Sequence, residues 1–220
     1  MCSRRGFLLL AVAVIVGIAG CGSSGSEPSG SPPASIATTT GGGGIVVVDD
    51  TAGQVCVADD AGGGEFNEPT FPDPTIDGVE RFRGMTHNHV EGCVDYTQNP
   101  PIGGDHRDVW QACQFYDRAV QPEQAVHSME HGAVWITYDP ALDASQRATL
   151  TEAARDYVLV SPWNRDPLPS PIVASAWGLQ LTVDSADDPR LAQFIQTYAN
   201  GPQNSEPGAA CLEGGSTDTL

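Results

Sequence analysis

The sequence predicts a single α+β domain with a mainly antiparallel sheet packed by two or three helices. Few helices are expected, and several candidate strands follow one another late in the chain, which favours antiparallel pairing. Once an N-terminal leader and linker are set aside, about 175 residues remain, a length that suits one domain with its own core. The chain shows no internal repeats.

The expected elements of the first half are short strands. They lie at residues 45–48, 54–58, 81–90 and 94–96. Alternation along the third of these strands would put Met85, His87 and His89 on one face, because successive side chains of a strand point to opposite sides. Residues 59–80 are rich in Gly, Pro, Asp and Glu, which predicts a loop there.

The second half contains the expected helices. They lie at residues 122–131, 144–156 and 189–199, and the strands between them at residues 133–138, 157–160, 172–176 and 179–183. Pro122 suits the first position of a helix, and Gly132 can take the left-handed conformation that ends one. Asp143 is placed to cap the second helix, and Asp188 precedes the proline that opens the third.

The first 20 residues predict a signal peptide. Arg4 and Arg5 precede an apolar stretch over residues 8–19, a pattern that resembles the twin-arginine export signal. The stretch is too short to span a bilayer as a helix, which argues against an uncleaved anchor. It runs up to Cys21 in a sequence that resembles the lipobox of bacterial lipoproteins. We therefore expect Cys21 to carry fatty acids such as palmitate, which would hold the protein at the outer face of the cell membrane.

A flexible tether is expected between the lipid and the folded domain. Residues 22–44 are almost entirely Gly, Ser, Pro, Ala and Thr, and such a segment buries too little apolar surface to fold. Its average reach as a coil is roughly 25–30 Å. We expect residues 21–44 to be the lipidated tether, residues 45–212 to form the globular domain and residues 213–220 to be a disordered tail.

The chain is strongly acidic and contains no lysine. Its formal charge is −18, and loss of Arg4 and Arg5 with the leader leaves eight arginines against 28 carboxylates, a charge of −20. A field of that sign repels nucleic acids and anionic lipids, so neither is an expected partner. Membrane contact is expected through the lipid on Cys21, and the sequence indicates no particular protein partner.

Four cysteines remain once the leader is removed and Cys21 is acylated. They are Cys56, Cys93, Cys113 and Cys211. In an oxidising compartment, four cysteines usually form two disulfides, for which three pairings exist. We favour Cys56–Cys93 and Cys113–Cys211, and the second bond would hold the C-terminal tail to the histidine region and stabilise the fold by roughly 4 kcal/mol. A cysteine acting as a metal ligand is the less favoured alternative.

All five histidines of the chain lie between residues 87 and 131. Because histidine is the commonest metal ligand, this clustering indicates a site. On the expected helix, His127 and His131 are four residues apart and share a face, which is the spacing of helical zinc motifs. His106 follows a loop with paired prolines and paired glycines, which can present its ring at a fixed point.

We expect the cluster to bind a transition metal, zinc or copper. The expected ligands are His89, His106, His127 and His131. His87 is a further candidate ligand, less favoured than these four. Neutral imidazoles suit zinc and copper, whereas calcium and magnesium prefer oxygen ligands. Met85 and Met129 are weak hints of copper, since thioethers favour Cu(I), although Met129 should point away from the helical histidines.

Two alternatives to a metal-binding role stay open. In the first, the protein is a metal-free interaction module of the envelope, and its histidines only hydrogen-bond the nearby carboxylates of Asp95, Asp105 and Glu130. In the second, it is a metal-dependent hydrolase, because residues 127–131 match the H-x-x-E-H pattern of some zinc peptidases, with Glu130 as general base. Those peptidases continue as helix after the motif, whereas here Gly132 and a strand follow, and the downstream Glu206 lies in a Pro- and Gly-rich stretch.

The motifs around these histidines resemble a known family. They include His89-Val90-Glu91-Gly92, Pro100-Pro101-x-Gly103-Gly104-x-His106 and His127-Ser128-x-Glu130-His131-Gly132. This set resembles the bacterial and archaeal exported domain-of-unknown-function family 3105, over roughly residues 89–211. The resemblance implies that His89, His106, His127, Glu130 and His131 are family positions. It also implies the disulfide Cys113–Cys211, because members often have these two cysteines without the other two. The family has no established activity.

Overall fold

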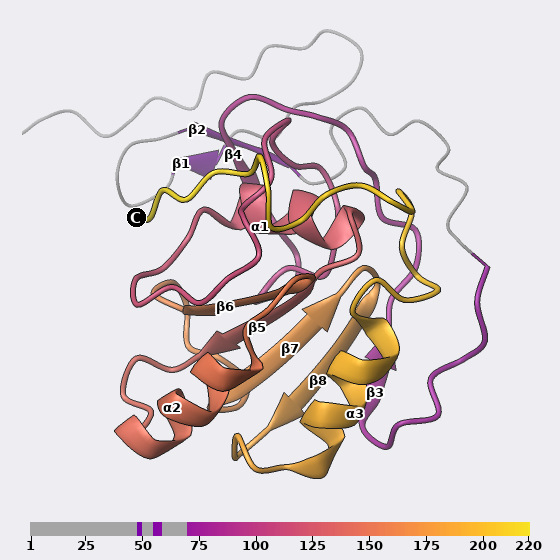
Figure 1. Ribbon diagram of the computed structural model, residues 1–220. Helices are drawn as coiled ribbons and strands as arrows, with labels where there is room; N and C mark the ends of the chain where they lie inside the picture. Colours follow the sequence, from indigo (N-terminus) through magenta and orange to yellow (C-terminus); the bar gives the residue numbers. More distant parts are fainter. Residues whose placement is uncertain (1–47, 50–54, 59–69) are drawn as a thin grey trace, which may run out of the picture. The chain divides into compact units, whose positions relative to one another are not determined.

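The computed structural model of the protein describes residues 48–49, 55–58 and 70–220 (Figure 1). The predicted signal peptide and tether, including Cys21, lie outside the described residues. Within the described residues, no helix is both long and apolar enough to cross a membrane. The α+β prediction is confirmed, because three helices accompany two sheets in this part of the chain and the larger sheet is mainly antiparallel.

The larger sheet has five strands. In spatial order they are β3 (Val79–Arg81), β8 (Leu179–Val183), β7 (Ile172–Ala176), β5 (Val134–Tyr138) and β6 (Val158–Pro162). Neighbouring strands are antiparallel except β5 and β6, which run parallel. The three strands β5, β6 and β7 are buried along their whole length, because packed groups cover both faces of the sheet at this end.

Alternation along β5 sends its side chains into two separate hydrophobic clusters. Ile136 packs in the cluster formed with α2 (Ala144–Ala153) and α3 (Pro189–Tyr198). Trp135, the preceding residue, packs in the cluster formed with α1 (Pro122–Glu130). Because neighbouring side chains of a strand point to opposite faces, α2 and α3 cover one face of the sheet and α1 lies over the other (Figure 1).

A smaller sheet lies in the N-terminal part of the described chain. Its strands are β1 (Val48–Asp49), β2 (Val55–Ala58) and β4 (Cys93–Asp95). β2 pairs antiparallel with β1 and parallel with β4, and the second pairing sets Cys56 opposite Cys93. These two residues form a disulfide, and Cys113 forms the other with Cys211. Both bonds confirm the favoured pairing, so none of these four cysteines is free to bind a metal.

The helix boundaries agree with the sequence to within a few residues. Gly132 follows α1 with a φ of 102°, as a left-handed stop should. A Cβ there would lie 2.7 Å from the Nδ2 of Asn204, so glycine is also required by this close approach. Asp143 caps α2 by accepting the backbone N–H of Gln146. α2 ends at Ala153 rather than at residue 156, because the chain already turns there towards β6.

The C-terminal residues 213–220 were expected to be disordered, but they pack against the domain. Ser216 donates its backbone N–H to the carbonyl of Trp110 at 2.8 Å, and its own carbonyl accepts the N–H of Ala112 at 2.8 Å. Leu220 donates to the carbonyl of Ala119 at 2.8 Å. The polar, glycine-containing sequence of the tail does not predict these contacts, because they are backbone hydrogen bonds, which need no hydrophobic pattern in the side chains.

Candidate metal centre

Four histidines meet beside α1 from three separate parts of the chain. The helix contributes His127 and Glu130, and His131 is the residue that caps its C-terminal end. The preceding loop contributes His106, and an extended segment further upstream contributes His89. The spacing of four residues between the two helical histidines thus places both rings on the same side of α1, with ring centroids 4.5 Å apart.

A short backbone bridge fixes His89 beside His106. The N–H of Val90 donates to the carbonyl of His106 at 2.8 Å, and the N–H of His106 donates to the carbonyl of Asn88 at 2.9 Å. A strand over residues 81–90 was expected, but β3 ends at Arg81. Around His89 the chain makes this parallel bridge instead, and the bridge is what carries the histidine to the site.

The first ligand group contains three histidines and one carboxylate. It consists of His89, His106, His127 and Glu130, each offering one ligand atom within 4.8 Å of the others. The three imidazole centroids are 4.8–5.0 Å apart. The side chains of His106, His127 and Glu130 are buried, whereas His89 is exposed and forms the solvent edge of the group.

Backbone carbonyls fix the orientation and the tautomer of the histidine rings. The Nδ1 of His106 lies 2.8 Å from the carbonyl oxygen of Gly104, and the Nδ1 of His127 lies 2.6 Å from that of Arg107. A carbonyl can only accept, so each Nδ1 must carry the hydrogen. In a neutral ring the lone pair is then on Nε2, the atom left to bind a metal. Metal-bound histidines are usually held by such a second hydrogen bond.

Glu130 lies against the free nitrogen of His106. Its Oε2 is 2.8 Å from the Nε2 of His106, and its Oε1 is 3.5 Å from the Nδ1 of His87. In the neutral tautomer of His106, two acceptor atoms face each other across this short contact. Burial would raise the pKa of Glu130, but the contact with His106 and the charges of the nearby histidines outweigh it and lower that pKa, so the group is a carboxylate at neutral pH.

His127 stands at the centre of the cluster and is held in its neutral form. Burial lowers the pKa of its ring to about 4, and repulsion from His106, His131 and His89 adds to this effect. The hydrogen bond to the carbonyl of Arg107 opposes the shift and is outweighed. A neutral imidazole at physiological pH is the form that binds a metal, so protons do not compete for this ligand near neutrality.

A second ligand group shares His127 with the first. It contains His127, His131 and Glu206, again with ligand atoms within 4.8 Å of one another. The Nδ1 of His131 lies 2.6 Å from the carbonyl oxygen of Ala210, which leaves its Nε2 facing the Oε2 of Glu206 at 3.3 Å. The ring of Trp110 lies 4.9 Å from that of His131, measured between centroids.

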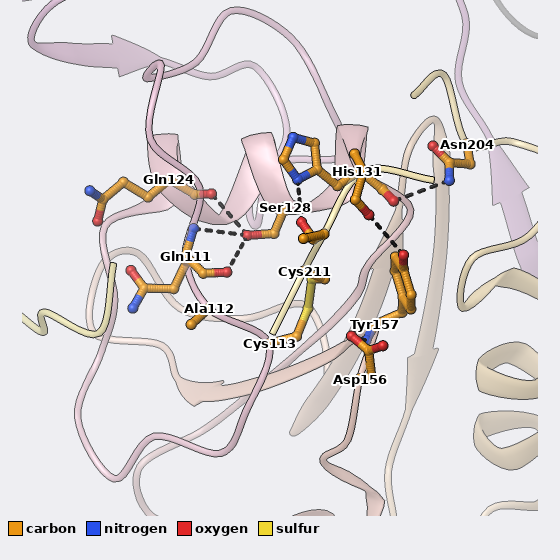
Figure 2. Close-up of a disulfide and its surroundings, with 12 residues drawn as sticks. Gln111, Ala112, Cys113, Gln124, Ser128, His131, Asp156, Tyr157, Asn204 and Cys211 are labelled. Atoms are coloured by element: carbon orange, nitrogen blue, oxygen red, sulfur yellow. Dashed lines mark hydrogen bonds between the residues drawn. A yellow bond between two sulfur atoms is a disulfide. The ribbon is translucent and has the colours of Figure 1, made fainter. Parts of the chain in front are cut away.

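The segment that carries Glu206 is fastened to the body on both sides. Asn204 donates its side-chain N–H to the carbonyl of His131 at 3.1 Å, and the disulfide to Cys113 holds Cys211 at the far end (Figure 2). Tyr157 also donates its hydroxyl hydrogen to the carbonyl of Ala209 at 2.7 Å. The position of Glu206 is thus determined by contacts that join residues far apart in the sequence.

The structure divides the expected ligands between the two groups. His89, His106 and His127 belong to the first, and His131 belongs to the second with His127. Glu130, considered as a possible base, joins the first ligand group. The sequence indicates Glu206 only as an acidic residue downstream of the motif, because its place beside His131 depends on the disulfide.

The less favoured candidates lie outside both groups. His87 is exposed, and its Nδ1 lies 3.5 Å from the Oε1 of Glu130. Met129 is fully buried in the hydrophobic cluster around Trp135, as its place on the helix predicted. Met85 packs against Gly103 and the same hydrophobic cluster. Both thioethers thus contact apolar groups of this cluster.

Comparison with protein families identifies this domain. The model of a family described as "Protein of unknown function (DUF3105)" matches residues 87–213, which is more than half of the 220 residues. Comparisons with curated proteins and with solved structures give no match. The matched region includes every residue of both ligand groups and the disulfide between Cys113 and Cys211. The chain therefore belongs to the DUF3105 family.

Proposed function

We propose that this protein binds one divalent transition metal ion, zinc in the first instance, through His89, His106, His127 and Glu130. The observation that carries this proposal is the pair of anchored rings. His106 and His127 each use Nδ1 to bind a backbone carbonyl, which leaves Nε2 of each ring for a metal ion. The Nε2 of His106 lies 2.8 Å from the Oε2 of Glu130, and the ligand atom of His127 is within 4.8 Å of those of the other group members. Metal-bound histidines have this second hydrogen bond, which sets ring orientation before the ion arrives.

The donor set favours zinc. Three imidazole nitrogens and one carboxylate oxygen are common zinc ligands, and four protein ligands suit a tetrahedral ion. Cu(II) also accepts imidazole, and it stays the alternative ion, whereas Cu(I) would be expected to use sulfur. A calcium or magnesium site would contain mainly oxygen ligands.

The competing explanation is a metal-free ion pair between protonated His106 and Glu130. It needs a hydrogen on the Nε2 of His106 aimed at the carboxylate. The carbonyl of Gly104 instead takes the hydrogen of the neutral ring on Nδ1, so the unprotonated Nε2 faces a carboxylate oxygen at 2.8 Å. A cation between these two acceptor atoms would remove their repulsion. A metal-free role also gives no account of why His127 turns its unprotonated nitrogen into the same group.

We further propose that the centre works outside the cytoplasm on a lipid-anchored domain. Two disulfides within the described residues are typical of an oxidising compartment. The lipid on Cys21, at the end of the lipobox-like sequence, would attach the chain to the membrane. The acidic folded domain would itself be repelled by anionic lipid headgroups. The role would be the capture or holding of a metal ion at the cell envelope.

Zinc titration of the mature protein tests the proposal. We expect one zinc per chain in protein purified from its own envelope, and an increase in the free energy of unfolding of about 4 kcal/mol when free zinc is 1,000 times its Kd. His127→Ala should weaken zinc binding by about 100-fold or more, because it removes a ligand rather than a supporting group.

His87→Ala is the matched control, because His87 approaches Glu130 but lies outside the ligand group. This variant should bind zinc about as tightly as the unchanged protein. Absence of zinc and copper from the purified protein, together with a melting temperature that chelator and added zinc leave unchanged, would establish the metal-free alternative.

A further inference from the structure

Two ligand groups meet at one shared residue. The first has four ligands, of which His106 and Glu130 are buried, and the second adds His131 and Glu206 to His127. We call these the inner position and the outer position. The names follow exposure, since the Glu206 side chain is 49% exposed whereas that of Glu130 is 4% exposed.

His127 can serve only one position at a time. Its Nδ1 is committed to the carbonyl of Arg107 at 2.6 Å, so Nε2 is the one nitrogen left to bind an ion. An imidazole nitrogen has a single lone pair and cannot bridge two metal ions through it. The two groups therefore compete for the same nitrogen, and full coordination at one position leaves the other with only its remaining ligands.

We infer that the centre has two alternating positions for one divalent transition metal ion, and that the ion enters at the outer position and passes through His127 to the inner one. This rests on the proposed function, because both positions use the same class of metal. The inner position has four ligands against three, and three of its four ligands are buried. The inner position should therefore bind the ion more tightly. At the outer position, Glu206 offers a solvent-facing carboxylate to the incoming ion.

The outer position is built into the structure. The carbonyl of Ala210 fixes the Nδ1 of His131 at 2.6 Å, just as other carbonyls fix the inner histidines. Glu206 is held by its own backbone as well, since its N–H donates to the Oδ1 of Asn204 at 2.8 Å. The Nε2 of His131 and the Oε2 of Glu206 are 3.3 Å apart, close enough for one ion to bind both.

Titration with Co²⁺ tests the inference, because the visible spectrum of this ion reports its ligands and geometry. The unchanged protein should bind one Co²⁺ per chain. The double variant His89→Ala/Glu130→Gln damages the inner position and should still bind one Co²⁺, more weakly and with a different spectrum. Adding Glu206→Gln to that variant should weaken the residual binding by a further factor of ten or more, as expected for loss of a ligand.

The rate of Co²⁺ loading is a second measurement, made on a protein that keeps all the histidines of both positions. Glu206→Gln alone should slow the loading of Co²⁺ several-fold, because the incoming ion loses the solvent-facing carboxylate of the outer position. Glu213→Gln is the matched control, since it removes an exposed carboxylate of the same C-terminal region that is in neither ligand group. It should leave loading unchanged.

The outcomes separate this inference from the proposed function. One Co²⁺ per chain with loading that is indifferent to Glu206→Gln would overturn the outer position and leave the inner site intact. Two Co²⁺ ions bound tightly per chain would overturn the sharing of His127. Failure of the unchanged protein to bind any Co²⁺ or zinc would defeat both. Circular dichroism of each variant shows whether it is folded, and the kinetic test stands if the double variant is not.

Discussion

The helices α1 and α2 differ in burial far more than in length. α1 has nine residues, of which eight are buried, whereas α2 has ten residues and buries only Leu150. α2 is thus a surface helix that covers the sheet with a single fully buried side chain. α1 is enclosed by loops, and among its buried residues are His127 and Glu130, which would destabilise the fold if they were left without partners.

Backbone groups of the surrounding loops supply those partners. The hydroxyl of Ser128 accepts the N–H of Gln111 at 3.0 Å and donates to its carbonyl at 2.6 Å. The Oε1 of Glu123 accepts the N–H of Val94 at 3.0 Å. The histidines are tied through Nδ1 in the same way. The comparison shows that the α2 side of the sheet serves stability, while the α1 side arranges polar groups and leaves ring nitrogens available.

The largest expected effect concerns the disulfide that fastens the C-terminal segment over α1. Cys113 and Cys211 are 98 residues apart, and their joint replacement by alanine should lower the free energy of unfolding by about 4 kcal/mol, because the unfolded chain regains its freedom. Urea unfolding of the metal-free protein measures this. The conservative change Leu212→Ala, at an exposed neighbour, should have little effect. A loss below about 1 kcal/mol would show that other contacts hold the segment.

Leu150→Ala tests the other side of the sheet. It removes the one buried side chain of α2, and large-to-small changes of this kind typically lower the free energy of unfolding by about 3 kcal/mol. Zinc stoichiometry and affinity should not change while the protein stays folded, because Leu150 is in the hydrophobic cluster on the opposite face from α1. Weakened zinc binding in folded Leu150→Ala protein would contradict the division of roles between the two faces.

The smallest of these effects is the response of the metal-free protein to acid. The pKa of His127 is about 4 in the folded protein and 6.5 in the unfolded chain, so the unfolded chain binds more protons between these values. The contribution of His127 is present above pH 6.5 and is lost as the pH falls. Between pH 7 and pH 5 the free energy of unfolding should drop by about 2 kcal/mol from this residue.

Urea unfolding at several pH values, in the presence of chelator, measures the acid response. The variant His127→Gln lacks the titrating group, so its stability should depend less on pH over the same interval. An equal dependence in both proteins would assign the effect to other groups and place His127 in a less buried environment than the structure gives it.

Local patterns in the chain were sufficient to predict much of the fold. The strands at residues 172–176 and 179–183 were predicted to the residue, since the first is a short, mostly apolar run and the second alternates apolar and polar residues. Proline and glycine marked the two ends of α1, and aspartate marked the start of α2. Both disulfides also followed the favoured pairing. The strands and helix ends depend on residues that are close in the sequence, and four cysteines allow only three disulfide pairings.

The division of the histidines into two ligand groups had no such local signal. It depends on a bridge that sets His89 beside His106, on three carbonyls that orient the rings, and on a disulfide that brings Glu206 to His131. Residue type and spacing in the sequence predict a metal site, because they indicate which side chains could act as ligands. Which atoms converge is settled by contacts between segments up to about a hundred residues apart, and those contacts form only when the chain packs.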